Sequence, residues 1–485
     1  MSSFIGGRRM TNKERLAIAA QEMPVQAPKV RAHNMQEVAL GFSEEQAKLE
    51  AERCLGCTNK PCIKGCPVAV DIPGFIAKIQ EGDFKAALET IKETNLLPAV
   101  CGRVCPQETQ CQAQCTVGKA LKDPAKAVAI GRLERFVADL DRGSKEQVAG
   151  SMPSPIDDDA KKVAVIGSGP AGLTVAADCA RAGHKVTIFE ALQKPGGVMI
   201  YGLPEFRLPK AIVQAEIDGL LKMGVTIETN FLVGQTETIA DFTEGGYDAV
   251  FIGTGAGLPK FLGCPGENLV GVLSANEYLT RANLMKAYDK EKADTPIYPA
   301  KIAAVIGGGN VAMDAARMAL RLGASEVHII YRRTRQEMPA RAEEVEHAME
   351  EGIRFNFLRN PTRFIGNDTG KLVSMELLEY DLGEADDSGR RSPVPIKGSE
   401  YTFNCDMVIV ALGNESNPLI SKTTTGLEVD KRGHIIVDKE TQKTSIDKVY
   451  AGGDIVLGSA TVILAMGEGR KAAAAINDLL KNNHE

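Results

Sequence analysis

The segment KKVAVIGSGPAGLTVAADCARAGHKVTIFEA (residues 161–191) contains an apolar run, a glycine-rich turn, a helical pattern and a second apolar run, in that order. This is the succession of a strand–turn–helix–strand unit. Gly167, Gly169 and Gly172 give the spacing G-x-G-x-x-G directly after the first run. The first glycine allows a tight turn, the second lets a pyrophosphate approach the backbone, and the third lets helix and strand pack closely. We therefore predict a Rossmann-like dinucleotide-binding unit, with the helix N-terminus facing the phosphates.

Further positions in this segment favour a bound dinucleotide. Glu190 ends the second apolar run, where an acid accepts hydrogen bonds from ribose hydroxyls. Pro170 and Ala171 lie inside the turn and are expected to contact the same ligand. The alternative is a glycine-rich turn that holds nothing, but the strand, the helix and the acid are all in place.

The same succession returns in KIAAVIGGGNVAMDAARMALRLGASEVHIIYRR (residues 301–333). Gly307, Gly309 and Ala312 give G-x-G-x-x-A, and Asn310 and Val311 are the adjoining predicted contacts. Two such units in one chain indicate two nucleotide-binding folds. The final 90 residues hold another apolar strand and a glycine-rich stretch that ends in a helix. The second unit is therefore expected to be inserted within the first.

The charge at the end of the second unit indicates which nucleotide it takes. Arg332 and Arg333 stand where an NAD-binding unit usually carries an acid, and Arg335 follows closely. A guanidinium pairs with a 2′-phosphate, whereas an acid would repel it, so we expect NADP(H). The alternative is that these arginines form only a solvated basic edge.

Eight of the eleven cysteines lie between Cys54 and Cys115, which favours a metal site over disulfides in a long intracellular chain. The Cys-Pro pairs formed by Cys66 and Cys105 are typical of ferredoxin-like iron–sulfur sites. Zinc is the alternative, but only Cys54 and Cys57 show the CxxC spacing of zinc sites. By number alone the eight cysteines would fill two [4Fe–4S] clusters. Their spacings are Cys54-x2-Cys57-x4-Cys62-x3-Cys66 and Cys101-x3-Cys105-x5-Cys111-x3-Cys115.

Charge and composition limit the possible partners and the location of the protein. A formal net charge of −6 gives no reason to expect nucleic acid or an anionic membrane as a partner. No apolar run approaches the roughly 20 residues that span a bilayer. No apolar core follows the pair Arg8–Arg9, so an export signal is not expected and the cytoplasm is the predicted location.

The predicted fold class is α/β: an α-helical domain with two [4Fe–4S] clusters, then two Rossmann-like domains, the NADP domain inserted in the FAD domain. The predicted divisions are an N-terminal arm (1–45), a helical iron–sulfur domain (46–150), the first segment of the FAD-binding domain (158–295), an NADP(H)-binding domain (296–400) and the second segment of the FAD-binding domain (401–485). FAD is expected because of the segment TSIDKVYAGGDIVLG (residues 444–458). This segment resembles the second FAD fingerprint of the pyridine-nucleotide–disulfide-reductase-like flavoproteins.

That resemblance implies that Gly453 and Asp454 bind FAD, with Asp454 on the ribityl chain. It also implies that a helix from about Thr461 and Val462 points its N-terminus at the flavin pyrimidine. A helix dipole in that place stabilises the anionic reduced flavin.

Over almost its whole length the chain resembles the small (β) subunit of NADPH-dependent glutamate synthase. It equally resembles the large subunit of electron-bifurcating NADH-dependent ferredoxin:NADP oxidoreductase and, more distantly, the N-terminal half of dihydropyrimidine dehydrogenase. The stretches that carry the resemblance are RCLGCTNKPCIKGCPVAVDIPGFI, GRVCPQETQC, IGRLERFVADL, VIGSGPAGL, YGLPEFRLPK, GGGNVAMD, YRRTRQEMPAR and YAGGD.

The resemblance implies that the cluster ligands cross over. One cluster would take Cys54, Cys57, Cys62 and Cys115. The other would take Cys66, Cys105, Cys111 and, as an oxygen ligand, Glu134, which leaves Cys101 spare. The alternative is that Cys101 is the eighth ligand and Glu134 a salt-bridged helix residue. The resemblance also places Arg207 close to FAD, with Gly196 and Gly197 letting the chain pass near the isoalloxazine.

The implied activity is hydride transfer between NADPH and FAD, then single-electron transfer through the two clusters to a partner subunit. No side chain is expected to act as a catalytic acid, base or nucleophile. The expected partner is a glutamate synthase large subunit or, in the electron-bifurcating alternative, a small FAD and [2Fe–2S] subunit; ferredoxin is a further possible partner. A module without nucleotide turnover is the rival hypothesis, and the intact glycine-rich turns argue against it.

Overall fold

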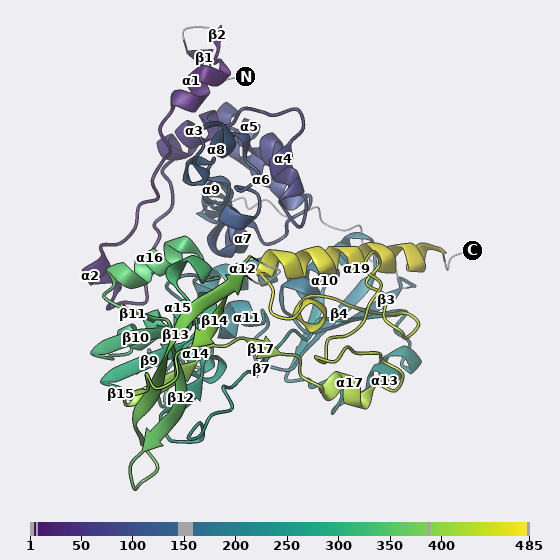
Figure 1. Ribbon diagram of the computed structural model, residues 1–485. Helices are drawn as coiled ribbons and strands as arrows, with labels where there is room; N and C mark the ends of the chain where they lie inside the picture. The colour runs from purple at the N-terminus through teal and green to yellow at the C-terminus, as the bar shows by residue number, and fades with distance from the viewer. Residues whose placement is uncertain (1–3, 6–7, 144–158, 386–388, 483–485) are drawn as a thin grey trace.

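The computed structural model describes residues 4–5, 8–143, 159–385 and 389–482. Figure 1 shows a helical domain at the N-terminal end that lies above two α/β units. The chain starts with two short strands and two short helices. These are β1 (Phe4–Ile5), β2 (Arg8–Arg9), α1 (Asn12–Ala17) and α2 (Pro28–Arg31). Among the described residues, no helix is long and apolar enough to cross a membrane.

The helical domain is built from short amphipathic helices with strong local stop and start signals. Ser43, Asp71 and Asp83 each cap a helix N-terminus with the side chain, and Gly82 ends a helix in the left-handed region, φ +78°. The helices bury a shared apolar core that includes Phe75. They are α3 (Glu44–Glu52), α4 (Pro61–Lys64), α5 (Ile72–Glu81), α6 (Phe84–Lys92), α7 (Pro98–Val104), α8 (Thr116–Ala120) and α9 (Ile130–Gly143), with 3-10 turns η1 (Gln107–Thr109) and η2 (Pro124–Lys126).

The first α/β unit is a five-stranded parallel sheet in the order β18-β6-β3-β4-β5. Its strands are β3 (Lys162–Ile166), β4 (Lys185–Glu190), β5 (Thr226–Thr229), β6 (Ala249–Ile252) and β18 (Val449–Ala451). The two long helices α10 (Pro170–Arg181) and α19 (Val462–Asn482) pack against each other. Strand β18 returns to this sheet after the whole second unit, so the second unit is an insertion. The smaller helices are α11 (Val198–Tyr201), α12 (Lys210–Lys222), α13 (Ile239–Glu244), α17 (Leu419–Thr423) and α18 (Asp454–Leu457).

The inserted unit carries its own parallel sheet, in the order β11-β10-β9-β16-β8. The strands are β8 (Val272–Ser274), β9 (Ile302–Ile306), β10 (Glu326–Tyr331), β11 (Arg354–Phe357) and β16 (Met407–Val410), and the helices are α14 (Ala275–Asn283), α15 (Asn310–Arg321) and α16 (Ala342–Glu350), with a 3-10 turn η3 (Arg335–Glu337). Strands β8 and β16 lie outside the range 296–400 expected for this domain. Divided by sheets, the inserted unit runs at least from 272 to 410.

A second, antiparallel sheet is appended to the inserted unit. It is formed by β12 (Arg359–Gly366), β13 (Leu372–Ala385), β14 (Arg391–Pro395) and β15 (Tyr401–Asn404). The short antiparallel pair β7 (Leu258–Pro259) and β17 (Asn414–Glu415) joins the outgoing and returning chains between the two units.

The N-terminal arm connects the helical domain to both α/β units. In Figure 1 it descends from the helical domain so that α2 lies beside α16 of the inserted unit. Arg31 of α2 donates from Nε to Glu351 at 3.1 Å and pairs with Glu350 at 2.5 Å. The backbone N–H of Val38 donates to the carbonyl of Phe206, in the first unit, at 2.9 Å. The arm thus links the helical domain to both α/β units.

Candidate functional site

A cavity of about 390 Å³ opens at the carboxyl ends of strands β3, β4, β6 and β18, where the connecting turns diverge. This is the position at which open parallel sheets bind ligands. Most of the predicted flavin-binding residues line it, although they come from distant segments of the chain. These residues are Gly167, Gly169, Pro170, Ala171, Glu190, Gly197, Gly453, Asp454, Thr461 and Val462.

The glycines of the first turn fit a pyrophosphate. Gly167 has φ +99°, and a Cβ there would lie 2.6 Å from the carbonyl oxygen of Gly253. Gly172 packs directly under Gly167, as the third glycine of the motif should. Gly169 caps α10, and a Cβ on it would meet no protein atom within 4 Å. Its backbone therefore faces open cavity at a helix N-terminus, where phosphate oxygens are favoured.

Glu190 holds the turn in place from the end of β4. One carboxylate oxygen accepts from the backbone N–H of Ser168 at 2.9 Å and from its hydroxyl, and the other accepts from the N–H of Leu192 at 2.8 Å. The Ser168 hydroxyl also accepts from the N–H of Gly196 at 2.9 Å. The acid thus links the glycine-rich turn to the 196–197 segment, and both border the cavity.

The far wall of the cavity is formed by the C-terminal portion of the chain. Asp454 begins α18, and burial raises the pKa of its carboxyl to about 6. Thr461 accepts from the N–H of Leu464 at 3.3 Å and so caps α19, whose N-terminus lines the cavity. Tyr201 also lines the cavity and was not predicted. Burial raises its pKa to about 12, and the nearby acids Asp454 and Glu190 contribute.

The second glycine-rich turn has the same local form. Gly309 caps α15, and a Cβ there would approach only Pro339, at 3.9 Å. Asn310 accepts from the N–H of Arg341 at 2.9 Å, and Val311 is 38% exposed at the open end of the helix. Gly307 has φ +143°, and its turn abuts the end of β16. The N-terminus of α15 is therefore accessible to an anion.

An arginine-rich edge lies beyond the end of β10. Arg332 is exposed, and Arg333 donates from Nε to the carbonyl of Arg391 at 2.7 Å. Arg390 donates to the hydroxyl of Tyr331 at 2.9 Å. Sequence reasoning missed Arg390 and Arg391, because a hairpin far along the chain brings them to this edge.

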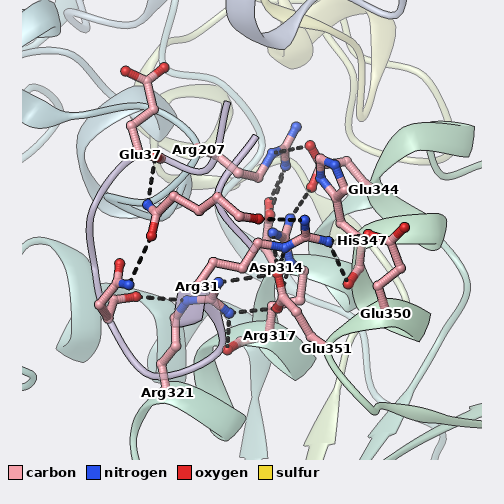
Figure 2. Close-up of polar contacts among 12 residues, drawn as sticks. Arg31, Glu37, Arg207, Asp314, Arg317, Arg321, Glu344, His347, Glu350 and Glu351 are labelled. Carbon is pink, nitrogen blue, oxygen red and sulfur yellow. Dashed lines mark hydrogen bonds and ion pairs between the residues drawn. The ribbon is translucent and has the colours of Figure 1, made fainter. Parts of the chain in front are cut away.

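Arg207, which was expected close to FAD, is not among the residues that line the flavin cavity. Its Nη1 lies 2.7 Å from each carboxylate oxygen of Asp314 on α15, and its Nε lies 3.2 Å from Glu344 on α16. Figure 2 shows the three side chains converging, beside Arg317. Burial lowers the pKa of Arg207, but the two acids outweigh it and raise the pKa above its ordinary value. Arg207 joins the two nucleotide-binding units.

The first cysteine cavity gathers four of the predicted cluster ligands. Cys54, Cys57, Cys62 and Cys115 line it together, although Cys115 is distant in sequence. Burial, with contributions from the neighbouring Cys54 and Cys115, raises the pKa of Cys62 to about 12. The Cys57 sulfur also contacts the Thr116 hydroxyl at 3.2 Å. Such a donor set, around a space lined by apolar side chains, fits an iron–sulfur cluster.

The second cysteine cavity contains Cys66, Cys105, Cys111 and Glu134, and Cys101 also lines it. Glu134 is buried and accepts from the amide of Asn95 at 2.6 Å; burial raises its pKa to about 8. Cys101 contacts Asn95 at 3.6 Å and the sulfur of Met466 at 3.7 Å. In the described residues, no group of three or more His, Cys, Asp or Glu is arranged to hold a single metal ion.

One helical turn separates the flavin cavity from the second cysteine cavity. In the first turn of α19, Val462 and Ala465 line the flavin cavity, and Ile463 lines the cysteine cavity. Gly467, one turn on, lies so close to the cysteine segment that a Cβ would be 3.0 Å from the carbonyl of Pro67. The set that contains Glu134 is therefore the one beside the flavin cavity.

Comparisons with known proteins place both parts of the chain in known families. Residues 161–474 match the family described as pyridine nucleotide-disulphide oxidoreductase, and residues 31–146 match the dihydropyrimidine dehydrogenase domain II, 4Fe-4S cluster. A glutamate synthase [NADPH] small chain of Halomonas elongata is 35% identical, over 97% of this chain and 99% of the relative. The NADP(+)-dependent formate dehydrogenase subunit beta of Moorella thermoacetica is 40% identical, over 92% of this chain and only 64% of its own length. Mycobacterium tuberculosis FprA in complex with NADPH shares the fold, with a TM-score of 0.56 at 21% identity, over 67% of this chain and 86% of FprA.

Proposed function

The chain belongs to the pyridine nucleotide-disulphide oxidoreductase family, in the group that includes the glutamate synthase [NADPH] small chains, and from this premise we propose that it is an NADP(H) oxidoreductase subunit with FAD and two [4Fe–4S] clusters. When bound, the flavin exchanges hydride with the nicotinamide and the clusters carry single electrons, which side chains cannot do. The observation that carries the proposal is the single turn of α19 between the flavin cavity and the second cysteine cavity.

The chain's own residues supply binding, orientation and exclusion of water. Gly167 and Gly169 with the α10 N-terminus would hold the FAD pyrophosphate, and Asp454 with the α19 N-terminus would hold the flavin end. The N-terminus of α15 and the arginine-rich edge would hold NADPH. Apolar side chains, among them the buried Ile463, would exclude water between the flavin and the nearer cluster.

The partner is proposed to be a second subunit that receives or supplies the electrons. The relatives described as small chains or beta subunits support this class of partner. A glutamate synthase large subunit is the proposed form of it. The electron-bifurcating alternative stays a prediction, since no feature of the described residues favours it.

Anaerobic addition of NADPH to the FAD-loaded protein is expected to bleach the visible flavin absorbance and then reduce the clusters. The reason is that both nucleotide sites and both cysteine cavities are formed in one chain. Stopped-flow absorbance and low-temperature EPR measure the two events. A protein that holds its full complement of FAD and iron, yet is not reduced by NADPH, would rule out the proposed function.

Replacing Arg332 and Arg333 with Ser is expected to raise the KM for NADPH about ten- to hundredfold, since charge-assisted hydrogen bonds contribute about 1.5–3 kcal/mol. The KM for NADH should stay constant or fall, because NADH lacks the 2′-phosphate. Arg363→Ser, which removes an exposed arginine paired with Glu376 on the appended sheet, is the matched control. Equal changes in both KM values would show that these arginines do not read the 2′-phosphate.

A further inference from the structure

The two cysteine cavities differ in their access to solvent. The second is covered by α19 and by the inserted unit, where the Arg341 guanidinium donates to the side chain of Gln107 at 3.3 Å, and its Cys105 and Cys111 are buried. Three of the four cysteines of the first cavity, Cys54, Cys57 and Cys62, are partly exposed, whereas Cys66 alone among the cysteines of the second cavity is. Electron-tunnelling rates fall steeply with distance, so an external redox partner would approach the first cavity.

The surface around the first cavity is basic, although the chain carries a net charge of −6. Residues 54–66 and 112–127, which contribute its cysteines, contain five lysines and one acid. All five lysines are exposed and lie within a few residues of a side chain that lines the cavity. We call them the lysine rim: Lys60, Lys64, Lys119, Lys122 and Lys126.

Two of the five lysines are paired with acids within the chain. Lys60 pairs with Asp71 at 2.9 Å, and Lys126 pairs with Asp123 at 3.6 Å. In the described regions of the chain, Lys64, Lys119 and Lys122 form no ion pair; Lys119 donates only to the neutral Gln114, at 3.1 Å. These three cations can therefore attract an anionic surface.

The lysines are carried by the segments that surround the first cavity. Lys60 is held at φ 41° as it caps α4, the helix that contains Cys62, and Lys122 is held at φ 52° just after α8. Helix α8 begins directly after Cys115. The rim is therefore attached to the same short helices that carry the cluster ligands, so a partner bound to it would lie against the first cavity.

We propose that the lysine rim is the docking surface for a redox protein with an acidic face, which exchanges electrons with the cluster of the first cavity. This inference rests on the proposed function and names the chemistry of its partner. Complementary charge steers association and can raise its rate by roughly 10- to 1,000-fold at low salt. Exposed lysines set around a partly exposed cluster provide such steering.

The test uses the anaerobic holoenzyme with NADPH and two haem proteins as acceptors: the acidic soluble domain of cytochrome b5 and the basic cytochrome c. Both are too large to enter the flavin cavity. The variant is Lys64→Glu with Lys122→Glu. The control is Lys371→Glu with Lys397→Glu, an equal charge change at two exposed lysines in turns of the appended sheet.

At low ionic strength the rim variant is expected to reduce cytochrome b5 about tenfold more slowly and cytochrome c faster, and the control pair should match the native protein. Added salt should slow the native reaction with cytochrome b5. Equal effects in rim and control variants, or none in either, would overturn the docking surface. NADPH reduction of flavin and clusters is followed in the same samples, and its failure in the native protein would instead overturn the proposed function.

Discussion

Replacing Cys111 with Ala is expected to remove about half of the iron and to lower NADPH-driven electron delivery to an external acceptor by at least about a hundredfold. Cys111 is buried and faces Cys66, Cys105 and Glu134 across the second cavity. Loss of a thiolate ligand should leave that cluster unassembled. The flavin would then lack an electron acceptor on the far side of α19. Flavin reduction by NADPH should stay near the native rate, because the flavin cavity is unaltered.

Cys101→Ala is the matched control, since both cysteines are buried in the same small domain. Its sulfur already contacts Asn95 and Met466, whereas the Glu134 carboxylate is buried and accepts a hydrogen bond from a neutral amide. The ionised form of a carboxyl buried in this way needs a compensating cation, which a cluster iron would supply. We therefore expect Cys101→Ala to keep its iron content and its cluster EPR signals. Loss of the same cluster in Cys101→Ala, with retention in Glu134→Ala, would make Cys101 the ligand instead.

Local sequence patterns were sufficient to predict the two nucleotide-binding units. The glycine spacing at Gly167 and Gly307 requires a backbone that few other residues adopt, and the flanking apolar runs form the central strands β3 and β9. The cavity that Gly169 and Asp454 share follows from parallel strands whose carboxyl ends meet at one edge.

Contacts between segments that are distant in sequence could not be predicted from local patterns. Spacing alone does not show that Cys115 joins Cys54 and Cys62 and not its neighbour Cys111, because the crossing depends on how α8 packs. That grouping required the family resemblance. Strand β8 precedes the second glycine-rich turn, yet it pairs with β16 in the second sheet, a pairing that the turn and its flanking runs do not predict. The family resemblance placed Arg207 close to FAD, and its contacts with Asp314 and Glu344 of the inserted unit could not be read from the loop sequence.

Replacing Arg207 with Met is expected to destabilise the junction of the two nucleotide-binding units by about 3–5 kcal/mol, the usual effect of removing one partner from a buried ion pair. Asp314 would lose both of its 2.7 Å contacts. Burial tends to raise the pKa of Glu344, but Arg207 and Arg317 outweigh it and hold the pKa at about 2; the variant would lose the Arg207 contribution. Figure 2 shows the side chains of Arg207, Asp314 and Glu344 facing one another.

Hydrogen exchange of the α15 amides measures this effect locally, and at least about a hundredfold faster exchange corresponds to the expected loss. Arg207→Met with Asp314→Leu should recover much of the stability, because it removes the uncompensated charge as well. Arg207→Lys should recover only some of it, since one ammonium nitrogen cannot take the places of both Nη1 at Asp314 and Nε at Glu344. Arg363→Met, at an exposed pair, should change stability by less than about 1 kcal/mol.

The same variant separates a positioning role from a structural one. The loop that carries Arg207 follows α11, whose Val198 and Tyr201 line the flavin cavity, and Asp314 lies on the helix that would hold NADPH. If the pair sets the distance between the two nucleotides, flavin reduction by NADPH should slow in Arg207→Met while reduction by dithionite does not. In the double variant, stability should return but the NADPH-driven rate should not. The hydrophobic pair of the double variant restores packing but not the directional contact that fixes the angle between the units. Full recovery of both the stability and the NADPH-driven rate would therefore show that Arg207 contributes stability alone.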